Sequence, residues 1–214
     1  MRVLVDGLAF QLDSGSANRF WQPVLNGLGL HNNIELMVLD RGNTPPMPAA
    51  DLIGFPSYTA TYTPADSLLI ERVARHYEAE VFFSTGCSTP IQTPSIAVIS
   101  ERHFDRATFA TRREWLETRL VLRHASRFLC LSDGAREKLQ SEHHGRLSAT
   151  EIKVASMEAG SASREAPADG RFDDIVSALA ELLAKAASAH RDGQDRIFYE
   201  RWAALRKIQQ DVDA

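Results

Sequence analysis

The sequence has little of several features that mark particular classes of protein. Cysteine occurs twice in 214 residues, at Cys87 and Cys130, which excludes a disulfide scaffold, and we expect both to be free thiols in a reducing cytoplasm. The net charge of −4 gives no basic surface for nucleic acid. No apolar run is long enough to span a bilayer. We therefore expect a cytoplasmic protein that does not span a membrane and does not bind nucleic acid.

Signals for secretion, metal binding and thiol chemistry are also lacking. The opening MRVLVDGLAF is interrupted by Asp6 and Gly7, so it is a poor signal peptide and predicts the first strand of the fold. No metal-ligand spacing is present, and the His143-His144 pair is predicted to cap a helix end. Cys87 has no basic partner close to it in the sequence, which argues against a thiol nucleophile. The sequence predicts neither a metal nor a cofactor.

What the sequence does have is an alternation of short apolar runs and amphipathic segments. The runs are nearly continuous in apolar residues, as in a parallel sheet covered on both faces, and the segments between them repeat apolar residues at helical spacing. This pattern predicts an α/β fold with a doubly wound, parallel, Rossmann-like sheet and right-handed crossovers. The predicted strands are 3–5, 34–39, 81–83, 96–99, 128–131 and 152–155, and the predicted helices are 20–28, 66–77, 112–125 and 134–140.

The character of the sequence changes after residue 155. We predict a Rossmann-like domain over residues 1–157 and a small, polar linker over 158–170. Residues 171–214 are predicted to form two helices, 172–189 and a final one that reads RIFYERWAALRKIQQ. Because no strand separates these helices, they are expected to pack on the sheet domain or on another chain.

Polar stretches follow the predicted strands, at the edge of the sheet where such folds bind ligands. Ser14, Gly15 and Ser16 are predicted to offer backbone N–H groups to a phosphate or sugar, the alternative being a plain turn. Glu101 and His103 are candidates for acid/base catalysis or for sugar-hydroxyl contacts, the alternative being a solvated loop of charges.

The short hydroxyl side chains of residues 85–89, among them Thr85 and Ser88, are candidates to bind an acceptor sugar. The alternative is that they satisfy the loop's own backbone. Ser132 is predicted to cap the helix that follows it.

Two stretches, VFFSTGCSTPIQTPSIAVISERHFD and EWLETRLVLRHASRFLCLSDGAREKL, resemble the N-terminal half of GT-B glycosyltransferases of the family-4 (group 1) type. The opening MRVLVDGLAF, the helix around residues 19–21 and the ending FYERWAALRKIQ are also similar to those enzymes. The resemblance covers roughly residues 1–157 and 195–210. It implies half of a GT-B fold. We expect Arg19 and Ser132, with Ser14, Gly15, Ser16, Thr85 and Ser88, to contact substrate, and Glu101 and His103, by their place near the ligand edge, to be catalytic.

The sequence also departs from that family. The second Rossmann domain, which binds the nucleotide-sugar donor, has no counterpart, and Ser100-Glu101 stands where the family has His or Tyr followed by Asp. Two hypotheses follow. The chain is an acceptor-side domain, active in hexosyl transfer only with a partner protein that supplies the donor site, or it is an inactive homologue that serves as a binding or assembly module. A sugar or nucleotide sugar is the expected ligand, and a homodimer is the alternative to a donor-domain partner.

Overall fold

The protein is described here by a computed structural model that covers residues 1–59, 65–143, 147, 151–155, 172–195 and 199–200. Seven strands form one sheet in the order β3-β2-β1-β4-β5-β6-β7, and every neighbouring pair is parallel. The α/β, Rossmann-like fold class predicted from the sequence is thereby confirmed. The strands are β1 (Arg2–Asp6), β2 (Glu35–Asp40), β3 (Asp51–Gly54), β4 (Val81–Ser84), β5 (Ser95–Ile99), β6 (Arg127–Cys130) and β7 (Ile152–Val154).

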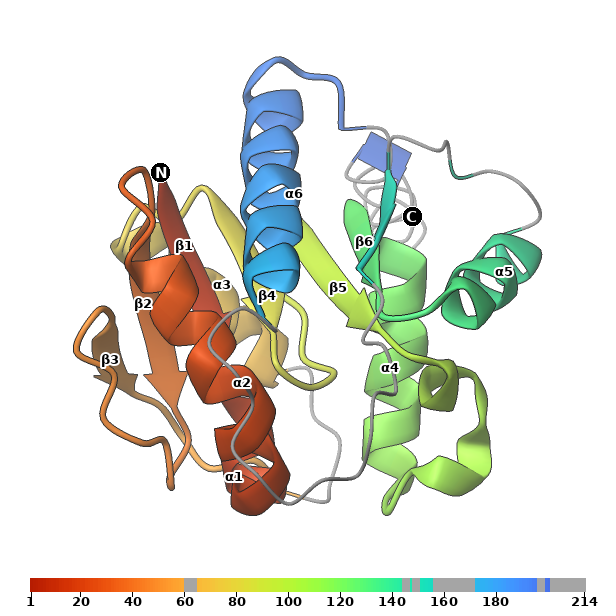
Figure 1. The fold of residues 1–214 in the computed structure, drawn as a ribbon, viewed down its shortest axis with the longest axis horizontal. Coiled ribbons are helices and arrows are strands. Elements are labelled where there is room, and N and C mark those ends of the chain that lie inside the picture. The colour runs from red at the N-terminus through yellow and green to blue at the C-terminus, as the bar shows by residue number, and fades with distance from the viewer. Residues whose placement is uncertain (60–64, 144–146, 148–150, 156–171, 196–198, 201–214) are drawn as a thin grey trace, which may run out of the picture.

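Helices cover both faces of this sheet (Figure 1). They are α1 (Leu8–Leu12), α2 (Ser14–Gly29), α3 (Ala65–His76), α4 (Arg112–His124), α5 (Asp133–Glu142) and α6 (Asp173–Arg191), with two short 3₁₀ helices, η1 (Glu101–Phe104) and η2 (Arg106–Thr108). Because successive side chains of a strand point to opposite faces, β1 contributes to two cores. Val3 and Val5 pack with α2 and α6, whereas Leu4 packs with α3 on the other face.

The helix α6 completes the first of these cores. Its Leu179 and Leu183 are fully buried beside the apolar residues of α2 and of strands β1, β4 and β5. Gly27 of α2 lies so close to α6 that a Cβ at this position would stand 2.8 Å from Val176 Cγ2. The described part of the C-terminal region thus packs on the sheet domain itself.

Three parts of the fold differ from the sequence-based expectation. Residues 8–12, for which no helix or strand was predicted, form the helix α1. The edge strand β3 was not predicted, because its four residues are mostly exposed and follow a proline-rich stretch without an apolar run. The links from β2 to β3 and from β4 to β5 contain no helix, so the alternation of strands and helices is incomplete.

The predictions for residues 156–170 and most of the final helix lie outside the described residues. Of that helix, only Tyr199 and Glu200 are described, and both are helical.

Candidate functional site

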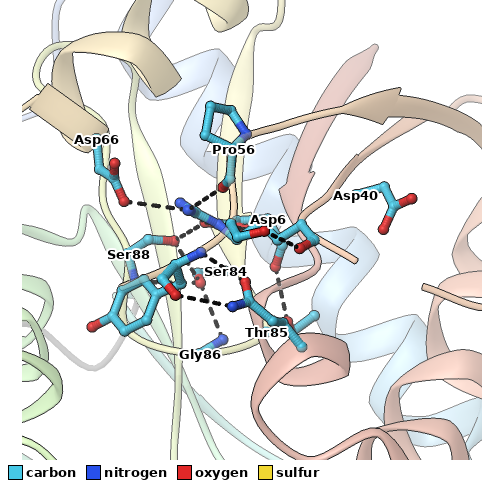
Figure 2. Close-up of polar contacts among 12 residues, drawn as sticks. Asp6, Asp40, Pro56, Asp66, Ser84, Thr85, Gly86 and Ser88 are labelled. Atoms are coloured by element: carbon cyan, nitrogen blue, oxygen red, sulfur yellow. Dashed lines mark hydrogen bonds and ion pairs between the residues drawn. The ribbon is translucent and has the colours of Figure 1, made fainter. Parts of the chain in front are cut away.

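The strand order reverses between β1 and β4, and in open parallel sheets a ligand crevice is expected outside the strand ends at such a point. Here that position is filled by side chains of the protein (Figure 2). The Ser88 hydroxyl donates to Asp6 Oδ2 at 2.5 Å and also lies 2.8 Å from Ser84 Oγ, so that the ends of both strands are joined. Asp6, Ser84 and Ser88 are all buried.

Asp6 is also paired with a buried arginine that follows β2. Arg41 donates from Nε and Nη2 to the Asp6 carboxylate at 2.8 and 2.9 Å, and from Nη1 to the Pro56 carbonyl at 3.0 Å. Its guanidinium lies over the Phe55 ring, 4.6 Å from the centroid. Burial alone lowers the pKa of Arg41, but the Asp6 carboxylate outweighs it and holds that pKa above its ordinary value. Arg41 is therefore a fixed positive charge inside the protein.

Asp66, in the first turn of α3, links Arg41 to a second buried arginine. Asp66 Oδ2 accepts from Arg41 Nη1 at 3.2 Å and from Arg113 Nη2 at 2.5 Å. Arg113 in turn donates from Nε to Glu117 Oε1 at 3.0 Å and from Nη1 to the Thr59 carbonyl at 2.7 Å. We refer to these five charged side chains as the ion network: Asp6, Arg41, Asp66, Arg113 and Glu117.

Two further side chains join the ion network at Glu117. The Tyr58 hydroxyl donates to Glu117 Oε2 at 2.5 Å, and Cys87 Sγ lies 3.9 Å from the same oxygen. Burial raises the pKa of Tyr58 and of Glu117, and it raises the pKa of Cys87 to about 12. The thiol is therefore neutral at physiological pH, which is unfavourable for a nucleophile.

Thr85 and Ser88, the predicted acceptor contacts, belong to the same interior. The Thr85 hydroxyl donates to the Asp6 carbonyl at 2.8 Å and accepts from the Ala9 amide at 3.0 Å. Both side chains are buried. Their contacts agree with the alternative in which the hydroxyl groups satisfy the protein's own polar atoms.

The other end of the β4–β5 connection is held by Glu71 of α3. Its Oε2 accepts from the backbone amides of Ile91, Gln92 and Thr93 at 3.2, 2.8 and 2.9 Å. Burial raises the pKa of Glu71, but these amides and Arg75 outweigh it, and the pKa lies below its ordinary value. The connection is thus fixed at both ends, by Asp6 and by Glu71.

The predicted loop Ser14-Gly15-Ser16 is the first turn of α2, which corrects the expectation of a loop there. Asp13 is the N-cap of this helix, and its carboxylate accepts from the Ser16 amide at 3.2 Å. The Ser16 hydroxyl and amide lower the pKa of Asp13. Ser14, Gly15, Ser16 and Arg19 are exposed. A carboxylate therefore already lies at this helix N-terminus, where a phosphate was expected.

Glu101 and Ser132 do come together, at the ends of β5 and β6. Ser132 caps α5 as predicted, accepting from the Ala135 amide, and its hydroxyl lies 3.3 Å from Glu101 Oε1. Glu101 Oε2 also accepts from Lys138 Nζ at 3.3 Å, and the Glu101 side chain remains 54% exposed. Gly134 makes room for this carboxylate, because a Cβ at 134 would lie 2.6 Å from Glu101 Oε1.

The His103 side chain bonds to Ser100 and not to Glu101 or Ser132. Its Nδ1 lies 3.0 Å from both the Ser100 amide and the Ser100 hydroxyl. Burial lowers the pKa of His103 to about 4, so the ring is neutral at physiological pH. The ring acts as part of a cap at the start of η1.

Most of the ion network could not be identified from the sequence. None of its five residues was predicted as part of a site, and Asp6 was noted only because it interrupts the opening apolar run. The one local signal was a pair of opposite charges four residues apart, Arg113 and Glu117, which is also common on exposed helix surfaces.

The described residues show neither a metal cluster nor a membrane-spanning helix. In the part of the chain that the structure covers, no cluster of three or more His, Cys, Asp or Glu side chains is arranged to hold a metal ion. Within the same residues, no helix combines the length and the apolar character needed to cross a membrane.

Comparison with known proteins finds similar solved structures but no related sequence. No protein-family profile matches the sequence, and no curated protein matches it either. Among solved structures, it is similar to S. aureus MnaA in a co-structure with UDP (16% identity, TM-score 0.49, 72% of this chain and 44% of that chain). It is also similar to UDP-N-acetylglucosamine 2-epimerase from Rickettsia bellii (14% identity, TM-score 0.47, covering 73% of this chain and 44% of that chain). The chain thus spans less than half the length of either protein.

Proposed function

We propose that this chain is the acceptor-side half of a GT-B-type, glycosyltransferase-like protein, and that a sugar or nucleotide sugar binds at the ends of β5 and β6. In parallel sheets ligands bind at the carboxyl ends of the strands, where these two ends lie. The position between β1 and β4 is occupied by Ser88 and the ion network. The observation that carries the proposal is the contact between Glu101 and Ser132, which brings two predicted site residues together where they are still open to solvent.

The chemistry of this edge suits a sugar hydroxyl. An exposed carboxylate accepts hydrogen bonds from hydroxyl groups, and Glu101 is a group there that is able to take a proton from an acceptor. His103 is neutral and held by Ser100, so it is a positioning residue for the η1 turn that carries Glu101. The donor site would lie on a second Rossmann-like domain, supplied by a partner protein or by a further part of the polypeptide.

A second candidate function is an inactive binding or assembly module. It is favoured by the ion pair of Glu101 with Lys138 and by the bonds of His103 to Ser100, since both side chains already have partners within the protein. Under this candidate the same edge still binds a sugar but transfers nothing.

Titration with a panel of free sugars and nucleotide sugars tests the proposed binding site, with amide chemical shifts as the readout. We expect the largest shifts at residues 100–104 and 132–138. Glu101→Gln should weaken binding at least several-fold. Glu137→Gln, which changes an exposed carboxylate of α5, should leave the affinity unchanged. Shifts confined to other strand ends, or equal affinity of both variants, would contradict the proposed site.

Transfer activity separates the two candidates. If the chain is an acceptor-side domain, mixing it with a donor-domain protein should give sugar transfer that Glu101→Gln reduces by 10²-fold or more. Binding that persists without transfer in any such mixture supports the inactive module instead.

A further inference from the structure

The first turns of α2 and α5 carry a glycine at the same position. Gly15 and Gly134 are each the second residue after the N-cap, which is Asp13 in α2 and Ser132 in α5. Glycine has the lowest helix propensity apart from proline. A Cβ at Gly15 would lie 3.7 Å from Asp13 Oδ1, an ordinary contact, whereas a Cβ at Gly134 would lie 2.6 Å from Glu101 Oε1 and 3.0 Å from Glu101 Cδ. At Gly134 the missing side chain therefore leaves the space that a carboxylate fills.

Two donors near the start of α5 hold that carboxylate. The Ser132 hydroxyl lies 3.3 Å from Glu101 Oε1, and Lys138 Nζ lies 3.3 Å from Glu101 Oε2. The Ser132 hydroxyl also accepts from the Ala135 amide at 3.0 Å, so it is used both as donor and as acceptor within the protein. The Glu101 side chain is still 54% exposed, and an ionised carboxylate only accepts hydrogen bonds. A ligand that meets Glu101 must therefore bring donors.

The charges of this edge are compensated in pairs. Lys138 pairs with Glu101, and Arg136 pairs with Asp133 at 2.8 Å. These are the two cations of α5. A phosphate group that sought either cation would have to displace a carboxylate from its ion pair. The hydroxyl groups of an uncharged sugar are able to donate to Glu101 without breaking a pair.

We propose that Gly134 is a positioning residue that fixes the Glu101 carboxylate against α5, and that the site so formed takes an uncharged sugar in preference to a phosphate group. This rests on the proposed sugar site and adds the class of its ligand. A methyl group at position 134 would overlap the carboxylate. Because that carboxylate is the end of a flexible side chain, it would move away from Ser132 and Lys138 while α5 keeps its fold.

Amide chemical shifts of residues 100–104 and 132–138 test the ligand class in the full chain. The probes are inorganic phosphate and the methyl glycosides of glucose, galactose, mannose and N-acetylglucosamine. We expect at least one glycoside to shift these amides, and phosphate at the same concentration to leave them unchanged. Gly134→Ala should weaken the binding of that glycoside about fivefold or more, because the group that accepts its hydroxyl hydrogens is displaced.

Urea unfolding separates this loss from damage to the fold. Gly134→Ala should unfold at the same urea concentration as the unaltered protein or at a higher one, because alanine has the higher helix propensity. Gly15→Ala, at the same position of α2, is the matched control for stability and should behave alike. Nuclear Overhauser cross-peaks between the Gly134 α protons and the Glu101 γ protons should report the placement of the carboxylate without any ligand.

The outcomes distinguish this inference from the proposed function. If no glycoside or nucleotide sugar binds to the unaltered protein, the proposed function fails, and the cross-peaks still decide whether Gly134 positions Glu101. If phosphate binds more tightly than every glycoside, the ligand class is overturned while the binding edge stands. A Gly134→Ala variant that keeps its full affinity for the glycoside, or that loses it together with its stability, would overturn the positioning role.

Discussion

At the scale of single residues, the clearest feature is the buried pair of Asp6 and Arg41. Both side chains are fully enclosed and joined by two short hydrogen bonds. Removing one partner of such a pair leaves a buried charge without its counterion, which costs more than the pair itself contributes. The pair therefore serves as a sensitive test of the described site.

We expect Asp6→Asn to lower the free energy of unfolding by about 3–5 kcal/mol, because Arg41 stays buried and keeps only Asp66, 3.2 Å from Nη1, as a counter-charge. Asp51→Asn, at an exposed position of the edge strand β3, should change it by less than about 0.5 kcal/mol. Urea unfolding monitored by circular dichroism measures both. A cost below about 1 kcal/mol for Asp6→Asn would mean that Asp66 or water neutralises Arg41 without Asp6.

His103 should make stability depend on pH in mild acid. The unfolded chain binds a proton at the usual His pKa of about 6.5, whereas folded His103 does so only at about 4. The unfolded state therefore binds more protons between these values, and stability falls as pH drops from about 6.5 to 4, on the order of 1–3 kcal/mol.

His103→Gln should remove that dependence, while His31→Gln, at an exposed position, should keep it. Thermal unfolding across pH 4–7 is the measurement. Identical pH profiles for the two variants would show that His103 is not the residue responsible.

Residue contacts of this kind differ in how well a sequence reveals them. Ser132 was predicted as a helix cap because its partner, the Ala135 amide, is three residues away. Arg41 is 35 residues from Asp6, and Tyr58 is 59 residues from Glu117. Such pairs depend on how the strands and helices are arranged, and no local pattern encodes them.

At the scale of elements, α2 ends where the chain has no room for a side chain. A Cβ at Gly29 would lie 2.1 Å from the Ala49 carbonyl oxygen, which is backbone and cannot rotate away. We expect Gly29→Ala to cost about 1–3 kcal/mol of stability through this overlap. Gly54→Ala in β3, where nothing lies within 4 Å, is the matched control and should be nearly neutral. Chemical denaturation measures the stability of both variants. Equal stability of Gly29→Ala and Gly54→Ala would mean that residues 44–50 move away from α2 at little cost.

The β4–β5 connection depends on one carboxylate of α3. The pKa of Glu71 is lowered in the folded state, so its contribution to stability is fully present above the unfolded value of about 4.3 and is lost as pH falls through the folded value. Glu71→Gln should therefore cost about 1–3 kcal/mol at pH 7, and its stability should approach that of the unaltered protein in acid.

Unfolding of the Glu71→Gln variant between pH 3 and 7 tests this, with Glu137→Gln as the exposed control. Hydrogen exchange at the amides of residues 91–93 gives a local readout. If the variant were less stable than the unaltered protein by the same free energy at every pH, the titration of Glu71 would be contradicted.

The elements that the sequence predicted share one property. Strands such as β1, β2 and β5 are buried over most of their length, so their apolar runs are visible without knowledge of the fold. β3 is mostly exposed and α1 is five residues long, and both exist because neighbouring elements hold them. The helix α4 was predicted in place, but the burial of Arg113 and Glu117 on its inner side follows from partners far away in the sequence.

At the scale of the whole molecule, α6 belongs to the same core as the sheet and α2. We expect Leu183→Ala to cost about 2–5 kcal/mol, because this fully buried side chain fills the core shared with α2 and the sheet. Leu30→Ala, at a position that is 75% exposed, should hardly change the free energy of unfolding. Thermal unfolding should also show one transition that both halves of the chain share, and two separate transitions would restore the predicted boundary near residue 157.

The ion network has a consequence for temperature. Removing charges from water becomes less unfavourable as temperature rises, because the hydration of charged groups has a strongly negative entropy. The cluster of Asp6, Arg41, Asp66, Arg113 and Glu117 should therefore contribute more, relative to an apolar filling of the same volume, in warm solution than in cold. The strand ends that it joins should be among the last parts of the sheet to open on heating.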